Sequence, residues 1–259
     1  MSIPDLIAKL RPSIAQIILL RKEERVGFGT AFLVKEGLIT SSRNIRSTGF
    51  DSAIIRFYDS TANNLVRLDS KSLCQAIIFE SPEKDKDYIC LKFPNHSFSN
   101  RPVLDFSQSP ALHTGEHVLF LGFAFTEAHL TSHIGFVSAL FQSNGVETIQ
   151  VDGSFNSGFS GAPLIDLKTS KVAAIITRVE TAAISEQFNN LAGALRRNQI
   201  ALERFRGTTL PGRDKIDPIE AIKNSQAAME QIVRYIRQSA SVGTGFAVNA
   251  KYIQSHLKG

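Results

Sequence analysis

Residues 149–164 read Ile-Gln-Val-Asp-Gly-Ser-Phe-Asn-Ser-Gly-Phe-Ser-Gly-Ala-Pro-Leu, and this stretch predicts more about the chain than any other. Ser160 follows a turn of small residues and precedes an apolar run. Gly158 allows the backbone to turn so that the N–H groups of Gly158 and Ser160 point into one hole, and Gly161 keeps the approach to the Ser160 hydroxyl open. The stretch therefore fits an acyl-transfer nucleophile with an oxyanion hole. The alternative is a Gly/Ser-rich turn between two strands, with no chemistry.

The stretch resembles the nucleophile segment of trypsin-like serine proteases in its Deg/HtrA form, Gly-Asn-Ser-Gly-Gly-Pro-Leu. Further segments resemble strands of the same family in the same order along the chain, and Lys251–Leu257 resembles its closing helix. The strand-like segments begin at Pro12, Gly27, Gly37, Asp87, Gly115, Ile134 and Gly245. The resemblance implies an all-β fold of two antiparallel six-stranded barrels, chymotrypsin-like, with a helical insertion and a short C-terminal helix.

This fold divides the chain into an N-terminal barrel at 1–107, a C-terminal barrel at 108–179 plus 241–259, and a helical insertion at 180–240. Short apolar runs broken by turn residues at intervals of about ten residues are typical of antiparallel barrels. The insertion departs from that pattern, because residues 191–205 and 217–238 show apolar residues at helical spacing. A short helix is predicted at 3–10. No PDZ-like module is expected after the closing helix.

The same resemblance assigns the catalytic positions. Asp87 matches the aspartate of the family's triad, with Asp85 as the competing candidate, and Ser160 matches the nucleophile. The family's Thr-x-x-His aligns with Thr40-Ser41-Ser42-Arg43, so Arg43 stands at the position of the missing histidine. None of the six histidines of the chain lies near this turn.

Arg43 changes the functional expectation. A serine hydroxyl is a weak nucleophile until a neighbouring base accepts its proton, and a guanidinium stays protonated at any accessible pH. We expect Arg43 to form a partly buried ion pair with the Asp87 carboxylate, which transfers no proton.

The resemblance also places the substrate pocket. Ser154 is expected at its base, and Thr177, Arg178 and Val179 are expected in its walls. A neutral residue at 154 argues against a requirement for Arg or Lys in a substrate, because no carboxylate is present to pair with either.

Composition and short motifs narrow the other possibilities. The net charge of +5 is spread along the chain, which argues against a nucleic-acid partner. The pairs His113/His117 and His129/His133 fall at expected strand or loop positions, where that spacing does not converge on a metal, so we expect neither metal nor cofactor. Cys74 and Cys90 are expected as reduced core residues of strands. The first residues do not resemble a signal peptide and no apolar run could span a bilayer, which favours a cytoplasmic protein without membrane contact.

Two functions follow. The first is a trypsin-like serine endopeptidase family member acting on polypeptides, inactive or strongly impaired through Arg43. The second is a pseudoprotease, a binding or scaffold module that engages a protein partner through the helical insertion.

Overall fold

The structure is a computed structural model that describes residues 1–46, 49–59, 65–93, 98, 100–108, 112–124, 129–181, 184–203, 218–239 and 241–257. It separates into two compact units. The β unit comprises Met1–Glu180 and Gly243–Gly259, and the helical unit comprises Thr181–Val242.

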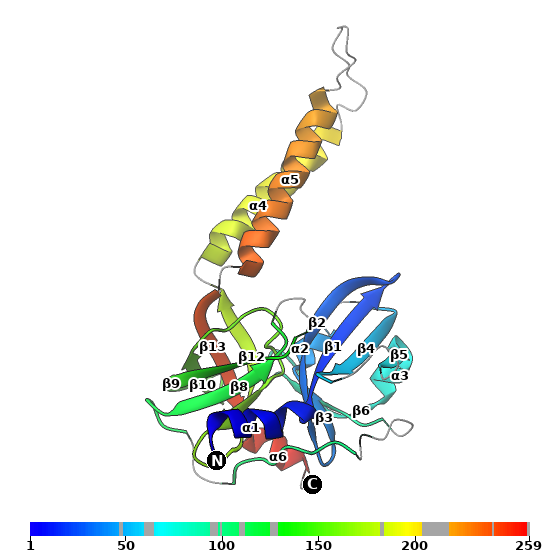
Figure 1. Cartoon of the computed structure of the whole chain (residues 1–259). Coiled ribbons are helices and arrows are strands. Elements are labelled where there is room, and N and C mark those ends of the chain that lie inside the picture. The colour runs from blue at the N-terminus through cyan, green and yellow to red at the C-terminus, as the bar shows by residue number, and fades with distance from the viewer. Residues whose placement is uncertain are drawn as a thin grey trace. The chain divides into compact units, whose positions relative to one another are not determined.

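The N-terminal part of the β unit is a curled antiparallel sheet of seven strands in the order β5-β4-β1-β2-β3-β7-β6 (Figure 1). The double-barrel class expected from the sequence is confirmed, although this sheet has seven strands rather than six. Asp69 ends β5 and caps the helix α3 by accepting a hydrogen bond from the N–H of Ser72, so the chain turns away before it forms β6 at the opposite edge. The elements of this part are β1 (Ile14–Arg21), β2 (Glu24–Val34), β3 (Gly37–Thr40), α2 (Ser42–Arg46), β4 (Ser52–Phe57), β5 (Val66–Asp69), α3 (Ser70–Gln75), β6 (Ile77–Ser81) and β7 (Tyr88–Leu91).

The C-terminal part of the β unit is a closed barrel of six strands in the order β10-β13-β12-β11-β8-β9. The last strand, β13, follows the helical unit in sequence and closes the barrel by pairing with β10. The residues on either side of the insertion therefore belong to one barrel. Its strands are β8 (His117–Gly122), β9 (Thr131–Ser143), β10 (Val146–Asp152), β11 (Pro163–Asp166), β12 (Lys171–Thr181) and β13 (Ser241–Asn249).

Apolar residues form one cluster inside each sheet and a third that joins the two. The third cluster contains Phe32 and Tyr88 from the first sheet and Leu121 and Ile165 from the second, all fully buried. Removing apolar surface from water in this way holds the two sheets together. The helices α1 (Ile3–Leu10) and α6 (Lys251–Leu257) also pack on this cluster, and α1 confirms the helix predicted at 3–10.

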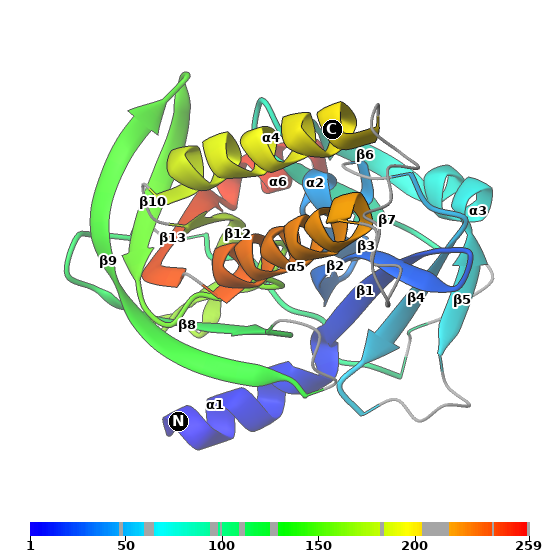
Figure 2. The ribbon, with the colours of Figure 1, turned by 90° about the horizontal axis from the view of Figure 1, so that it is seen from above.

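The helical unit contains α4 (Ile184–Glu203) and α5 (Pro218–Ser239), which lie side by side (Figures 1 and 2). Both predicted helices are present, but α4 begins at Ile184 rather than at residue 191. Asp217, the first residue of the second predicted helix, lies outside the described residues. Leu195 and Val233 are the buried apolar residues of this pair in the described part of the chain. No helix within the described ranges is long and apolar enough to cross a membrane.

The two cysteines are unpaired thiols in different environments. Cys90 lies buried in β7, as expected, and burial raises the pKa of its thiol to about 12. The expectation for Cys74 is wrong, because Cys74 belongs to α3 and is exposed. The cap at Asp69 starts a helix where the apolar pattern had indicated a strand.

Candidate active site

Ser160 lies in the turn between β10 and β11, and two glycines give this turn its shape. Gly158 has φ +105° and Gly161 has φ +87°, in a region of backbone conformation that side chains disfavour. A Cβ at Gly158 would lie 2.1 Å from the carbonyl oxygen of Phe123. A Cβ at Gly161 would lie 2.1 Å from the carbonyl oxygen of Thr30. Both positions therefore require glycine for its conformation and for its lack of a side chain.

Thr30, on β2 of the seven-stranded sheet, holds this turn in place through hydrogen bonds. Its N–H donates to the carbonyl oxygen of Ser160 at 2.9 Å, and its hydroxyl donates to the carbonyl oxygen of Gly158 at 2.7 Å. The same hydroxyl accepts from the N–H of Phe123 at 3.0 Å. Thr30 is fully buried, so these bonds are shielded from water. Nothing in the sequence marks Thr30 for this role, because it resembles an ordinary strand residue.

Asn44 also holds the Ser160 backbone, a role that the sequence does not predict. Its side-chain Nδ2 donates to the carbonyl oxygen of Ser160 at 2.8 Å and contacts Thr40 Oγ1 at 3.0 Å. It can approach so closely because Gly29 has no side chain; a Cβ there would lie 2.1 Å from Asn44 Nδ2. The Ser160 carbonyl oxygen therefore accepts two hydrogen bonds, one from the Thr30 N–H and one from Asn44 Nδ2.

The predicted oxyanion donors are unused within the described part of the chain, since the N–H groups of Gly158 and Ser160 donate no hydrogen bond there. The Ser160 hydroxyl donates to the carbonyl oxygen of Thr177, on β12, at 3.1 Å. A peptide carbonyl is an acceptor but does not take up a proton near neutral pH.

Asp87 lies just before β7 and is buried, with φ +52°. Its Oδ1 accepts from the N–H of Arg43 at 2.8 Å and its Oδ2 accepts from the Ser41 hydroxyl at 2.8 Å. Burial, the largest effect, raises the pKa of Asp87 to about 6, although both hydrogen bonds act to lower it. Asp87 thus contacts the start of α2 on both of its oxygens.

The Arg43 side chain does not pair with Asp87, which corrects the ion pair expected from the sequence. Its Nε lies 3.3 Å from Glu83 Oε1, and both side chains are about half exposed. The reason is that the Asp87 carboxylate is buried, while Glu83 offers a carboxylate in solvent. A guanidinium loses less hydration there than beside a buried group.

A cavity of about 150 Å³ lies beside these residues, within the β unit. Arg43, on α2, and Asp87, just before β7, line it from the N-terminal part of the β unit, and Thr177 and Arg178 line it from β12. Ser154 does not line this cavity and is exposed. The side chain of the next residue, Phe155, is fully buried and stacks on Phe120. Val179 lies on β12, with its side chain outside the described residues.

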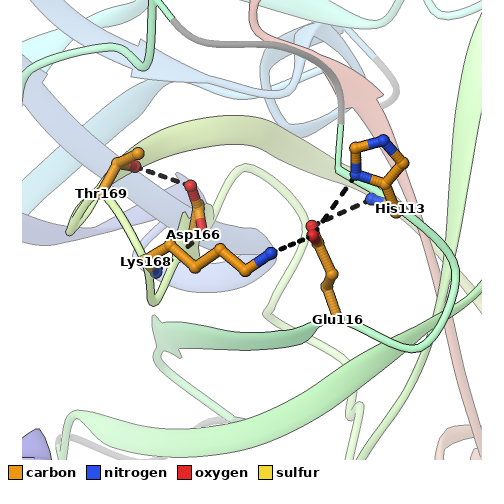
Figure 3. Close-up of polar contacts among 5 residues, drawn as sticks. All are labelled: His113, Glu116, Asp166, Lys168 and Thr169. Atoms are coloured by element: carbon orange, nitrogen blue, oxygen red, sulfur yellow. Dashed lines mark hydrogen bonds and ion pairs between the residues drawn. The ribbon is translucent and has the colours of Figure 1, made fainter.

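One histidine of each pair takes part in another contact. Figure 3 shows that the His113 ring and N–H both approach the Glu116 carboxylate and that Lys168 pairs with the same carboxylate. His113 Nδ1 lies 3.3 Å from Glu116 Oε1, and the His113 N–H donates to Glu116 Oε2 at 2.9 Å. These contacts, the Lys168 bond first, lower the pKa of Glu116 to about 2. His133 stacks on Phe120 in the barrel wall. The described residues contain no group of three metal-binding side chains.

Comparison with known proteins shows the family to which the chain belongs. Residues 29–175, more than half of the chain, match the trypsin-like peptidase domain family. The chain belongs to this family. It is 27% identical over 230 residues to serine protease HTRA1A of Danio rerio, a match that covers 80% of this chain and 43% of that protein. The chain thus spans less than half the length of this relative.

Solved structures show the same fold as this trypsin-like peptidase domain. One is the HtrA-type protease AlgW with a tripeptide, with a TM-score of 0.60, 18% identity, and coverage of 100% of this chain and 63% of AlgW. Another is an inactive form of Rv3671c from M. tuberculosis, with a TM-score of 0.56, 15% identity, and coverage of 98% and 88%. At these identities the likeness shows the fold alone.

Proposed function

We propose that this trypsin-like peptidase domain binds polypeptides in the cleft beside Ser160 and hydrolyses them negligibly. One observation carries the proposal. The residue that hydrogen-bonds through its N–H to the Asp87 carboxylate is Arg43, whose side chain pairs with Glu83 and has no group that can accept a proton.

The chemistry of acyl transfer supports this. Attack by a serine hydroxyl requires a base that takes its proton and later returns it to the leaving amine. Here the Ser160 hydroxyl donates to a main-chain carbonyl, and each Asp87 oxygen already accepts a hydrogen bond from another donor. Loss of a triad member leaves only the residual rate that the oxyanion donors and binding supply, orders of magnitude below an intact enzyme.

Polypeptide binding is supported by the turn geometry and by the relatives. Gly158 and Ser160 keep two N–H donors available within the described residues. Structures of AlgW contain a tripeptide or a decapeptide. We extend that ligand class to this chain as part of the proposal.

The test combines an active-site probe with rescue. The chain should label negligibly with a fluorophosphonate and should not cleave casein. Arg43→His should gain both activities, since Asp87 would then orient an imidazole beside Ser160. Arg43→His/Ser160→Ala is the control and should remain silent. Strong labelling of Ser160 in the unchanged chain would refute the proposal, because another base would then be acting.

A second candidate function is binding of a protein partner through the helical unit. This is supported by large apolar side chains that are exposed on both helices, namely Leu191, Ile200, Ile222, Met229 and Ile232. Exposed apolar residues in such number are typical of interaction surfaces. The first partner to test is a second copy of the chain. Sedimentation velocity should show an oligomer that Met229→Glu/Ile232→Glu converts to a monomer, whereas a monomeric unchanged chain would exclude self-association.

A further inference from the structure

The cavity beside Asp87 is lined mainly by polar and charged side chains. Arg178 stands on β12, directly after Thr177, whose carbonyl oxygen accepts the Ser160 hydroxyl. Arg43, on α2 in the N-terminal part of the β unit, also lines the cavity. Two arginines from the two parts of the β unit therefore line one small space, together with the residue that bonds to the Ser160 hydroxyl.

Arg178 is held in a defined orientation by an aromatic side chain. Its Cζ lies 4.5 Å from the centroid of the Phe246 ring on β13, and Phe141 on β9 packs edge-on against the same ring. The ring supports the flat face of the guanidinium and leaves its N–H edges for other acceptors. Among the described residues Arg178 has no ion-pair partner, so those edges are available to a ligand.

Arg43 is positioned by a carboxylate. Its guanidinium pairs with Glu83 through Nε at 3.3 Å, and this pair is about half exposed. A guanidinium has five N–H donors and no acceptor, so it can bind a second carboxylate beside the first.

The remaining charges of the cavity leave an excess of cations. Lys84 and Lys86 line it together with Arg43 and Arg178, against the carboxylates Glu83, Asp85 and Asp87. Glu83 is already paired with Arg43, and Asp87 is buried and hydrogen-bonded. Asp85 is the one lining carboxylate without such a partner in the described part of the chain.

We propose that this cavity is a subsite for a carboxylate of the bound polypeptide, with Arg178 and Arg43 as its ligands. The proposal rests on the peptide-binding function above and specifies its ligand. The cavity has room for several water molecules, so it can admit an Asp or Glu side chain or a C-terminal carboxylate. The substitution that removes the catalytic base thereby supplies one of the two cations of the subsite.

The first test is binding to an array of overlapping casein peptides, each repeated with its acidic residues changed to amides. The chain should favour acidic peptides, and affinity should fall about tenfold in the amide forms, the loss expected for one charge-assisted hydrogen bond. Arg178→Gln should lose this preference while keeping its affinity for the amide forms. Lys9→Gln removes the same charge from α1 and should behave like the unchanged chain. Repeating the bound peptides with C-terminal amides separates a terminal carboxylate from a side chain.

The second test needs no peptide. Titration with N-acetylglutamate amide should shift the arginine Nε–Hε NMR signals of the chain at millimolar concentrations, and N-acetylglutamine amide should not. Arg178→Gln should abolish the shift. Peptide binding without acid preference, or one unaffected by Arg178→Gln, would overturn the subsite and leave the proposed function standing. Absence of peptide binding together with a specific glutamate shift would refute the function and keep the subsite. Absence of both peptide binding and the N-acetylglutamate amide shift would refute the function and the subsite together.

Discussion

The N–H of Arg43 donates a 2.8 Å hydrogen bond to Asp87 Oδ1, while the side chain of Arg43 turns away to Glu83. The main chain at position 43 thus holds the buried carboxylate in place whatever the side chain is. This separates the structural role of the position, which is backbone-mediated, from the chemical role, which depends on the side chain. It explains how an arginine can occupy the position without disturbing the surrounding fold.

Arg43→His should leave stability almost unchanged. The pair that it breaks is half exposed on both sides, and such pairs contribute about 0–1 kcal/mol. A buried pair with Asp87 would instead have cost about 3–5 kcal/mol. Urea unfolding of Arg43→His and of Glu83→Gln should give free energies within about 1 kcal/mol of the unchanged chain. A larger loss in Arg43→His alone would mean that the guanidinium does contact Asp87.

The stability contribution of Asp87 should fall as the pH rises from 4 to 7. Its folded-state pKa, about 6, lies above its ordinary value of 3.8, so the folded chain binds this proton more tightly than the unfolded chain. The advantage is complete below pH 3.8 and is lost as the pH passes 6. At about 1.36 kcal/mol per pKa unit, the change is at most about 3 kcal/mol. The free energy of unfolding relative to Asp87→Asn should show this decline; a difference that grows with pH would show that burial does not dominate.

Gly161→Ala should destabilise the chain by about 3 kcal/mol or more, because it adds both backbone strain and a steric clash. Gly115→Ala is a matched control: Gly115 has φ +89°, close to the +87° of Gly161, but nothing lies within 4 Å of a Cβ there. It should cost about 1–2 kcal/mol, from strain alone. Equal losses of stability for Gly161→Ala and Gly115→Ala, in thermal or urea unfolding, would contradict the close approach of Thr30 to Gly161.

Thr30→Val should loosen the turn that contains Ser160, while the volume of the side chain at position 30 stays nearly constant. It removes the hydroxyl that bonds to the Gly158 carbonyl and to the Phe123 N–H, and leaves these buried groups unsatisfied. The expected loss is about 2 kcal/mol. Thr30→Ser keeps the hydroxyl and should lose only about 1 kcal/mol through the missing methyl group. In the Arg43→His background, Thr30→Val should also lower fluorophosphonate labelling more than Thr30→Ser does; the reverse order would exclude this role for the hydroxyl.

The sequence was sufficient for the fold class and for the glycine turn around Ser160. Strand alternation and turn spacing reflect which side chains are buried, and a glycine with positive φ is required locally, so both leave a pattern in the chain. The helices of the insertion were also predictable, although the start of α4 was placed too late. The strand assigned to Cys74 was wrong because one capping aspartate outweighed the apolar pattern.

Only the tertiary structure decided what surrounds the predicted residues. Thr30 and Asn44 lie far from Ser160 in sequence and hold its turn through bonds between the two sheets. The partner of Arg43 depended on the burial of Asp87 and the exposure of Glu83, which no local pattern records. The sequence by itself determined that the side chain at position 43 accepts no proton, because that follows from the chemistry of arginine. Where the guanidinium goes instead depended on the hydration and hydrogen-bonding needs of neighbours that only folding brings together.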